Sequence, residues 1–218
     1  TDELKKQIEA VMTMVALEDL YRPYRPKRRT RATIAKEKGL EPLAEILRAQ
    51  ATTRTIEEEA TAFVDAEKGV ESVQDAIDGA KDILAEVYAD DADYRTKLRA
   101  MTKESGSLVA KAKDEEADSV YEMYYDFSEP IKKLVGHRIL AINRGEAEKF
   151  LTVKIEAPRQ EILLWLVKQI IGNMKHDSAS YLYEAITDSY DRLIAPSIER
   201  EIRNELTEKA EEGAIGVF

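Results

Sequence analysis

The sequence predicts a mainly helical protein with at most a small two-stranded β-ribbon and a long C-terminal helix that is kinked or broken near Pro196. The 218-residue chain contains only 9 Gly and 6 Pro, and strong helix formers dominate the rest. Apolar residues recur at helical spacing along most of the chain. Two short segments instead alternate apolar and polar residues, as half-buried strands do. The length fits one large domain or two modest ones.

The first half of the chain is expected to be helical throughout. Thr1 has the side chain of a helix cap, and the helix that follows it, with apolar residues at positions 4, 8, 11 and 15, should end before Pro23 and Pro26. A short helix is expected over 31–38, closed by Gly39, and Pro42 should open the next one. Further helices are expected over residues 55–67, 70–89 and 93–104.

The two alternating segments, 107–111 (S-L-V-A-K) and 151–156 (L-T-V-K-I-E), are the expected strands. They are too short for a large sheet, which is why at most a two-stranded ribbon is predicted. Between them, three tyrosines fall on one helical face, and a further helix is expected over 137–148. The tyrosines are Tyr121, Tyr124 and Tyr125.

The C-terminal third should contain a helix over 158–171 and a long helical tract over 179–212. Apolar residues in that tract recur every four positions from Leu182 to Ala210. A strict period of four drifts by about 40° per step on a helix of 3.6 residues per turn. Either Pro196 therefore kinks the helix and resets its register, or the stripe contacts several neighbours in turn.

The charge is unevenly distributed along the chain. The formal net charge is −10, but the segment from Arg22 to Lys38 carries +7 and the remainder −17. Acidic surface repels phosphates, so the surface as a whole should not coat nucleic acid, whereas one local basic site remains compatible. The basic residues of this segment are Arg22, Arg25, Lys27, Arg28, Arg29, Arg31, Lys36 and Lys38, with Glu37 as the one acid.

Two interpretations of this basic segment stay open. Its cations, interleaved with Tyr21 and Tyr24, suit nucleic acid, because phosphates attract cations and bases stack on aromatic rings. The same arginines also suit bidentate pairs with this chain's own carboxylates, the interpretation that residue chemistry alone favours. The candidate nucleic-acid contacts are Arg22, Arg25, Lys27, Arg28, Arg29, Arg31 and Lys36 here, and Arg138 and Arg144 in H-R-I-L-A-I-N-R-G-E (137–146).

The sequence shows few signs of catalysis. It has no cysteine, and its two histidines, His137 and His176, lack the spacing of a helical zinc site. It also lacks the common phosphate-loop and nucleophile motifs. A non-enzymatic protein without a cofactor or metal is therefore expected. The longest apolar run is six residues, Ile162–Val167, so no membrane segment is expected, and the chain, which begins at Thr1, is interpreted as a fragment.

Four segments carry a resemblance to a known family. They are residues 17–44, which contain the P-Y-R-P-K-R-R-T-R run, 79–86 (G-A-K-D-I-L-A-E), 137–146, and 190–218. Together they resemble the bacterial Tex family of transcription accessory proteins, related to the eukaryotic elongation factor that also acts as a histone chaperone. The resemblance implies a multidomain, cytoplasmic protein of which residues 1–218 form the N-terminal helical region. The RNase H-like domain, the helix-hairpin-helix motifs and the RNA-binding β-barrel would then be absent.

That resemblance implies a function concerned with transcription. The expected role is a non-catalytic helical scaffold that supports binding of RNA or DNA, mostly through the domains outside this chain. RNA polymerase or other transcription proteins are the further expected partners. The alternative is a protein–protein interaction module that contacts the transcription machinery, with the basic segment making internal salt bridges.

Overall fold

The computed structural model describes residues 1–218 except 12, 27, 174, 217 and 218. The described chain is mainly helical and divides into two compact units. The first unit comprises Thr1–Thr96 and Gln160–Ala195, and the second Lys97–Arg159 and Pro196–Phe218. Every helix among the described residues is too short or too polar to cross a lipid bilayer.

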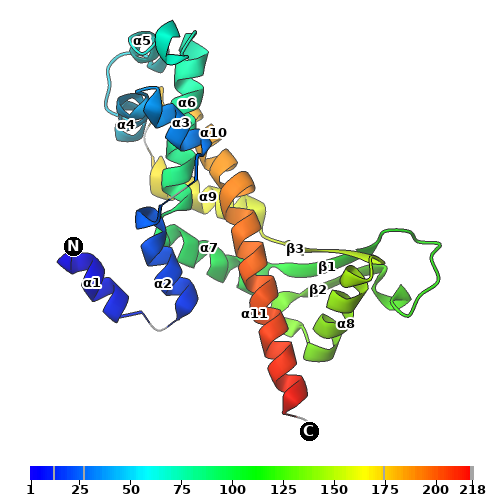
Figure 1. Cartoon of the computed structure of the whole chain (residues 1–218). Coiled ribbons are helices and arrows are strands. Elements are labelled where there is room, and N and C mark those ends of the chain that lie inside the picture. The colour runs from blue at the N-terminus through cyan, green and yellow to red at the C-terminus, as the bar shows by residue number, and fades with distance from the viewer. Residues whose placement is uncertain (12, 27, 174, 217–218) are drawn as a thin grey trace. The chain divides into compact units, whose positions relative to one another are not determined.

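The first unit is built from helices (Figure 1). They are α1 (Asp2–Glu9), α2 (Met14–Tyr21), the 3₁₀ turn η1 (Arg22–Tyr24), α3 (Arg31–Glu37), α4 (Glu41–Ala49), α5 (Ile56–Thr61), the 3₁₀ turn η2 (Ala66–Lys68), α6 (Val73–Ala89), the start of α7 (Ala92–Ser105), α9 (Arg159–Ile170), α10 (Ala179–Asp188) and the π-helical segment η5 (Ser189–Ile194). The prediction of a single first helix is wrong. Thr13 caps a separate α2, because its hydroxyl accepts a hydrogen bond from the Ala16 amide at 3.2 Å.

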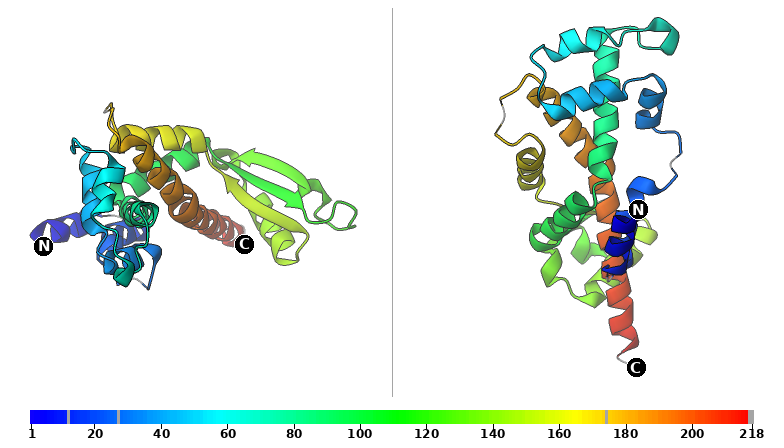
Figure 2. Two further views of the ribbon diagram at one scale, coloured as in Figure 1. Left: turned by 90° about the horizontal axis from the view of Figure 1, so that it is seen from above. Right: turned by 90° about the vertical axis from the view of Figure 1, so that its left-hand side faces the viewer.

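Helix α6 is the centre of this unit. It packs against α3, α4, α5 and α10, which surround it in both views of Figure 2. The core side chains that these helices contribute are fully buried, among them Leu43, Leu47, Ile77, Leu84 and Ile186. The predicted end of α3 is confirmed, because Gly39 has a φ of 78°, a left-handed conformation that few other residues adopt readily.

The second unit contains a three-stranded antiparallel sheet in the order β2-β1-β3. Its strands are β1 (Ser107–Ala112), β2 (Asp126–Pro130) and β3 (Leu151–Glu156), and its helical elements are most of α7, the 3₁₀ turns η3 (Glu122–Tyr124) and η4 (Ile131–Lys133), α8 (Gly136–Ala147) and α11 (Ala195–Ile215). The observed sheet therefore has one strand more than the predicted two-stranded ribbon, and that prediction is not confirmed. The tyrosines at 121–125 lie around η3 rather than along an α-helix.

The predicted kink near Pro196 is not confirmed. Pro196 is the second residue of α11, where its missing N–H is tolerated, and the irregularity is instead the π-helical segment before it. There the Ala195 amide donates to the Tyr190 carbonyl, five residues back. The buried stripe continues through Ile194 in the first unit and from Ile198 in the second, so it serves successive neighbours.

Candidate functional site

The basic segment lies between α2 and α3 in the first unit. Arg22 begins a 3₁₀ turn whose second residue is Pro23, and the backbone is extended at Arg25, after this turn, and at Thr30, before α3. Thr30 caps α3 through a capping box: its hydroxyl accepts from the Thr33 amide at 3.1 Å, and the Thr33 hydroxyl accepts from the Thr30 amide at 2.7 Å. The candidate contact Lys27 lies outside the described residues.

Four arginines of the first unit line one open hollow of about 340 Å³. They are Arg22, Arg25, Arg28 and Arg95, and the carboxylates of Glu86 and Asp90 line the same hollow. The Thr30 hydroxyl donates to Glu86 Oε2 at 2.9 Å, which holds that carboxylate against the start of α3. With more cations than carboxylates around it, the hollow suits an anionic group.

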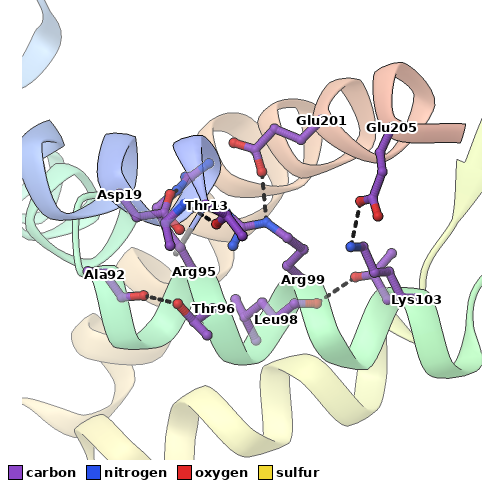
Figure 3. A network of polar contacts seen from close by, with 12 residues as sticks. Thr13, Asp19, Ala92, Arg95, Thr96, Leu98, Arg99, Lys103, Glu201 and Glu205 are labelled. Atoms are coloured by element: carbon purple, nitrogen blue, oxygen red, sulfur yellow. Dashed lines mark hydrogen bonds and ion pairs between the residues drawn. The ribbon is translucent and has the colours of Figure 1, made fainter. Parts of the chain in front are cut away.

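Arg95 at this hollow has a structural role. Figure 3 shows Arg95 beside Asp19, where its Nε donates to Asp19 Oδ1 at 3.1 Å. Its Nη1 donates to the Ala89 carbonyl at 3.2 Å. The two side chains are 1% and 2% exposed, so this is a fully buried ion pair that ties α2 to α7. The exposed cations beside the hollow are instead Arg25 and Arg28, which make no ion pair with another described residue.

The other cations of the segment are partly engaged with the chain's own carboxylates. Arg29 pairs with Glu37 at 3.3 Å, although both side chains are more than half exposed. Arg31 begins α3 and lines an open hollow with several carboxylates, and its charge acts on two of them, Asp82 and Asp188. Lys36 is exposed in the last turn of α3. Internal pairing therefore accounts for Arg29 and, in part, for Arg31.

The pKa values of the two carboxylates near Arg31, Asp82 and Asp188, are shifted in opposite directions. Burial raises the pKa of Asp82, although the charges of Arg192 and Arg31 oppose this. For Asp188, the hydrogen bonds from the Arg192 guanidinium lower the pKa, and the charge of Arg31 adds to that effect. Asp82 is thus the less well compensated of the two charges.

An acidic row on α6, which is not among the sequence-predicted site residues, faces this segment. Asp75, Asp78, Asp82 and Glu86 follow one face of α6 at intervals of three or four residues. Three of them line, with Arg31 and Lys38, a second open hollow of about 330 Å³. Their spacing is visible in the sequence, but only the packing of α3 on α6 shows that the row faces the basic segment.

The remaining two candidates, Arg138 and Arg144, belong to the second unit. Both lie on α8, where Arg138 Nη1 pairs with Glu129 Oε2 at 2.8 Å and Arg144 is exposed. Arg138 therefore braces α8 against β2. His176 is half-buried: its Nε2 lies 2.7 Å from the Thr52 carbonyl oxygen and its Nδ1 lies 2.7 Å from the Ser178 hydroxyl.

Comparison with known proteins bears on this arrangement. Residues 51–218 match the family model described as Tex central region-like. The chain belongs to the Tex family. The predicted resemblance is thus confirmed. The basic segment precedes the residues that this model matches.

Individual relatives align over all or nearly all of this chain. The Bacillus subtilis protein YdcI is 47% identical over 100% of this chain and 31% of its own length. The protein tex of Bordetella pertussis is 34% identical over 100% of this chain and 29% of its own length. The human S1 RNA-binding domain-containing protein 1 is 30% identical over 94% of this chain and 22% of its own length. The chain thus spans less than a third of each of these relatives.

In this Tex-family chain a polar network also runs along α11, beside the apolar stripe that the sequence predicts. At about 100° per residue, the apolar positions 198, 202, 206 and 210 form one face. Glu201 and Glu205 flank that face on one side, and Glu199, Arg203 and Thr207 flank it on the other. Both flanks are hydrogen-bonded to other elements of the second unit.

Each flank of α11 contacts different elements. Glu201 accepts from Arg99 Nε of α7 at 3.0 Å, and Glu205 pairs with Lys103 of the same helix at 2.5 Å (Figure 3). Arg203 pairs with Glu146 of α8 at 2.6 Å. The Glu199 carboxylate accepts a hydrogen bond from the backbone amide of Ile155 in β3 at 2.8 Å. The Thr207 hydroxyl accepts one from the side-chain Nδ2 of Asn143 in α8 at 2.9 Å. The helix therefore ties α7, α8 and β3 together.

Proposed function

We propose that this chain is a non-catalytic helical scaffold segment of a Tex-family transcription accessory factor and that it supports nucleic-acid binding by that factor. In this proposal Arg25 and Arg28 form an auxiliary contact for phosphate groups. RNA or DNA is the proposed partner, bound mostly by parts of the protein outside this chain. The names of relatives support this direction: a Neisseria gonorrhoeae relative is called transcriptional accessory protein Tex, and the human relative is named for an S1 RNA-binding domain.

The observation that supports the scaffold role is that α11 is hydrogen-bonded to neighbouring elements on both sides of its apolar stripe. Its side chains at 199, 201, 203, 205 and 207 are all engaged with α7, α8 or β3, on both sides of a buried apolar stripe. Polar side chains committed in this way fix the direction of the helix, because each flank opposes rotation about its axis. A long helix held in one orientation is suited to transmitting position rather than to binding a small substrate.

The auxiliary contact rests on the hollow beside α3. Arg25 and Arg28 are exposed there, and Glu86 is already engaged by the Thr30 hydroxyl. Guanidinium groups bind phosphate oxygens in a bidentate manner, so two free arginines can hold one or two phosphates of a strand. Because the chain as a whole has a net charge of −10, such a contact should be weak and sensitive to salt.

A protein-interaction role is the second candidate, and the acidic row on α6 favours it. Asp75 and Asp78 line an open hollow and present negative charge to solvent, which steers basic protein surfaces. In that case Arg29 and Arg31 serve mainly to balance charge within the chain. Transcription proteins, including RNA polymerase, would be the partners.

Fluorescence anisotropy separates the two candidates. Labelled single- and double-stranded DNA and RNA would be titrated with the chain at about 50 and 200 mM salt. The scaffold with an auxiliary phosphate contact predicts weak binding at the lower salt that decreases at the higher salt. Absence of binding to all four probes at the lower salt would leave the protein-interaction role.

A further inference from the structure

We infer that the loop between β1 and β2 is a docking surface for a basic polypeptide segment that also carries apolar side chains. This acidic loop, residues 113–125, belongs to the second unit and lies at the far end of the β1–β2 hairpin, away from α11 (Figure 1). The inference goes beyond the proposed scaffold role and does not depend on the basic segment. It rests on three observations: two exposed apolar side chains, tyrosines that hold the loop in place, and a predominance of negative charge in the loop.

The first observation is the exposure of two large apolar side chains. Val120 is 84% exposed and Met123 is 74% exposed, the highest values among the exposed large apolar residues of this unit apart from Ile215 near the C-terminus. They stand three residues apart in the same loop. A single exposed apolar residue is ordinary, but two such residues three positions apart in one loop favour a contact surface. Methionine is well suited to such a surface, since its flexible thioether adapts to varied partners.

The second observation is that the loop is firmly braced by its tyrosines. Tyr121 and Tyr124 are 4% and 6% exposed, and their rings pack on Phe150 and Phe127 at centroid distances of 5.8 and 5.4 Å. The Tyr125 hydroxyl donates to the Ala117 carbonyl at 2.6 Å. These contacts bury Tyr121 and Tyr124 and hold the partly buried Tyr125 in place, so the tyrosines of the loop are engaged within it. The two apolar side chains are therefore presented to solvent by a pre-ordered loop, which lowers the entropy lost on binding.

The third observation is the charge around the apolar pair. Five carboxylates of the loop are exposed, and Lys113 is its one basic residue; the carboxylates are Asp114, Glu115, Glu116, Asp118 and Glu122. This charge repels the phosphates of nucleic acid and also disfavours pairing of the loop with a second copy of itself. It attracts lysine and arginine side chains. A loop that exposes two apolar side chains together with five carboxylates is thus complementary to a basic, amphipathic segment of another protein.

A model peptide tests the docking surface. The probe is a labelled amphipathic peptide of about 16 residues, with lysines on one helical face and leucines on the other, whose binding is followed by anisotropy. The apolar variant is V120S/M123S and the acidic variant is E115Q/E116Q/D118N. Their matched controls, at exposed positions elsewhere, are M14S and E208Q/E211Q/E212Q. Both loop variants should weaken binding by about tenfold or more, and both controls by less than about twofold.

Two further measurements on the unmodified chain locate the binding site and check its oligomeric state. Backbone amide NMR shifts of the unmodified chain should change on peptide addition mainly within residues 113–125, a readout independent of whether any variant folds. Sedimentation should show a monomer at the concentrations used. Equal loss of affinity in the controls, shifts centred on α6, or a dimer that depends on Val120 and Met123 would each overturn the inference. Equal binding of a peptide with glutamate in place of lysine would do the same.

Discussion

Asp19 and Arg95, which are 76 residues apart in the sequence, form a fully buried ion pair with Nε and Oδ1 3.1 Å apart. The pair joins α2, which leads into the basic segment, to α7. Removing Asp19 leaves the guanidinium buried without this carboxylate, so Asp19→Ala should lower the free energy of unfolding by about 3–5 kcal/mol. Urea titration followed by Trp165, the one tryptophan, reports on this unit, since its ring packs edge-on against Tyr94.

The matched control for this pair is Arg29→Ala. It removes the ion pair with Glu37, in which both side chains are more than half exposed, and should change stability by less than about 1 kcal/mol. A loss for Asp19→Ala no greater than that for Arg29→Ala would contradict a stabilising role for the buried pair.

Glycine at position 79 allows α3 and α6 to approach closely. A Cβ placed there would lie 2.3 Å from Leu40 Cδ1 and 3.3 Å from Ala35 Cβ, both on buried side chains. Gly79→Ala should therefore destabilise the first unit by about 1–3 kcal/mol through overpacking. Gly213→Ala in α11 is the control, because nothing lies within 4 Å of its Cβ, and it should stabilise the helix by about 0.5–1 kcal/mol. Thermal melts of both variants measure these changes: the Tm should fall for Gly79→Ala and rise for Gly213→Ala.

The opposite pKa shifts of Asp82 and Asp188 predict opposite responses to pH. Because Arg192 lowers the folded-state pKa of Asp188, its ionised form stabilises the fold, and that stability is lost as the pH falls below the ordinary value of 3.8. Asp188→Asn should thus destabilise at neutral pH and have little effect in acid. Burial raises the pKa of Asp82, so its ionised form opposes folding at neutral pH, and Asp82→Asn should be stabilising there.

Urea midpoints measured from neutral pH down to about pH 3 check both variants. The two differences from the unmodified chain should have opposite signs at neutral pH. The Asp82→Asn difference should shrink as the pH falls toward 3.8, because the raised pKa of Asp82 lies above that value, whereas the Asp188→Asn difference should shrink only below 3.8. Two differences of the same sign at neutral pH would show that the charge of Arg192 does not distinguish these carboxylates.

The two flanks of α11 should control the opening of that helix. Burial alone would raise the pKa of Glu205, but hydrogen bonds from Lys103 and Lys209 bring it below its ordinary value. Charge-assisted hydrogen bonds are each worth about 1.5–3 kcal/mol, so E201Q/E205Q should speed amide hydrogen exchange in α11 by about tenfold or more. Hydrogen exchange followed by mass spectrometry measures this. The control E208Q/E211Q changes exposed residues of the same helix and should leave exchange almost unchanged.

Most helices could be predicted from the sequence because they carry local signals. Gly39 and Pro42 mark the end of α3 and the start of α4, and β3 matches its predicted bounds because Leu151, Val153 and Ile155 alternate with polar residues. Strand β2 has no such signal. Its sequence, D-F-S-E-P, contains one large apolar residue and ends in proline, and it becomes a strand only because β1 offers it an edge.

The candidate site was only partly predictable for the same reason. The cluster of cations in the basic segment is a local property, so it can be identified from the sequence alone. The surroundings of these cations depend on residues far away in the sequence: Thr30 meets Glu86 across 56 positions, and Arg95, which lines the same hollow, reaches Asp19 across 76. The acidic row of α6 and the flanks of α11 could have been noticed from their spacing, but their partners depend on tertiary packing.

The most direct measurement of the central proposal is the salt dependence of nucleic-acid binding in two charge-matched variants. R25Q/R28Q removes the two exposed arginines at the hollow, and K5Q/K6Q removes two exposed lysines of α1. If two phosphates are contacted, log K against log salt should have a slope near −2 for the unmodified chain on double-stranded DNA. R25Q/R28Q should bring this slope close to zero, while K5Q/K6Q retains it. Equal slopes for the two variants, or an unchanged slope for R25Q/R28Q in a folded protein, would contradict the account.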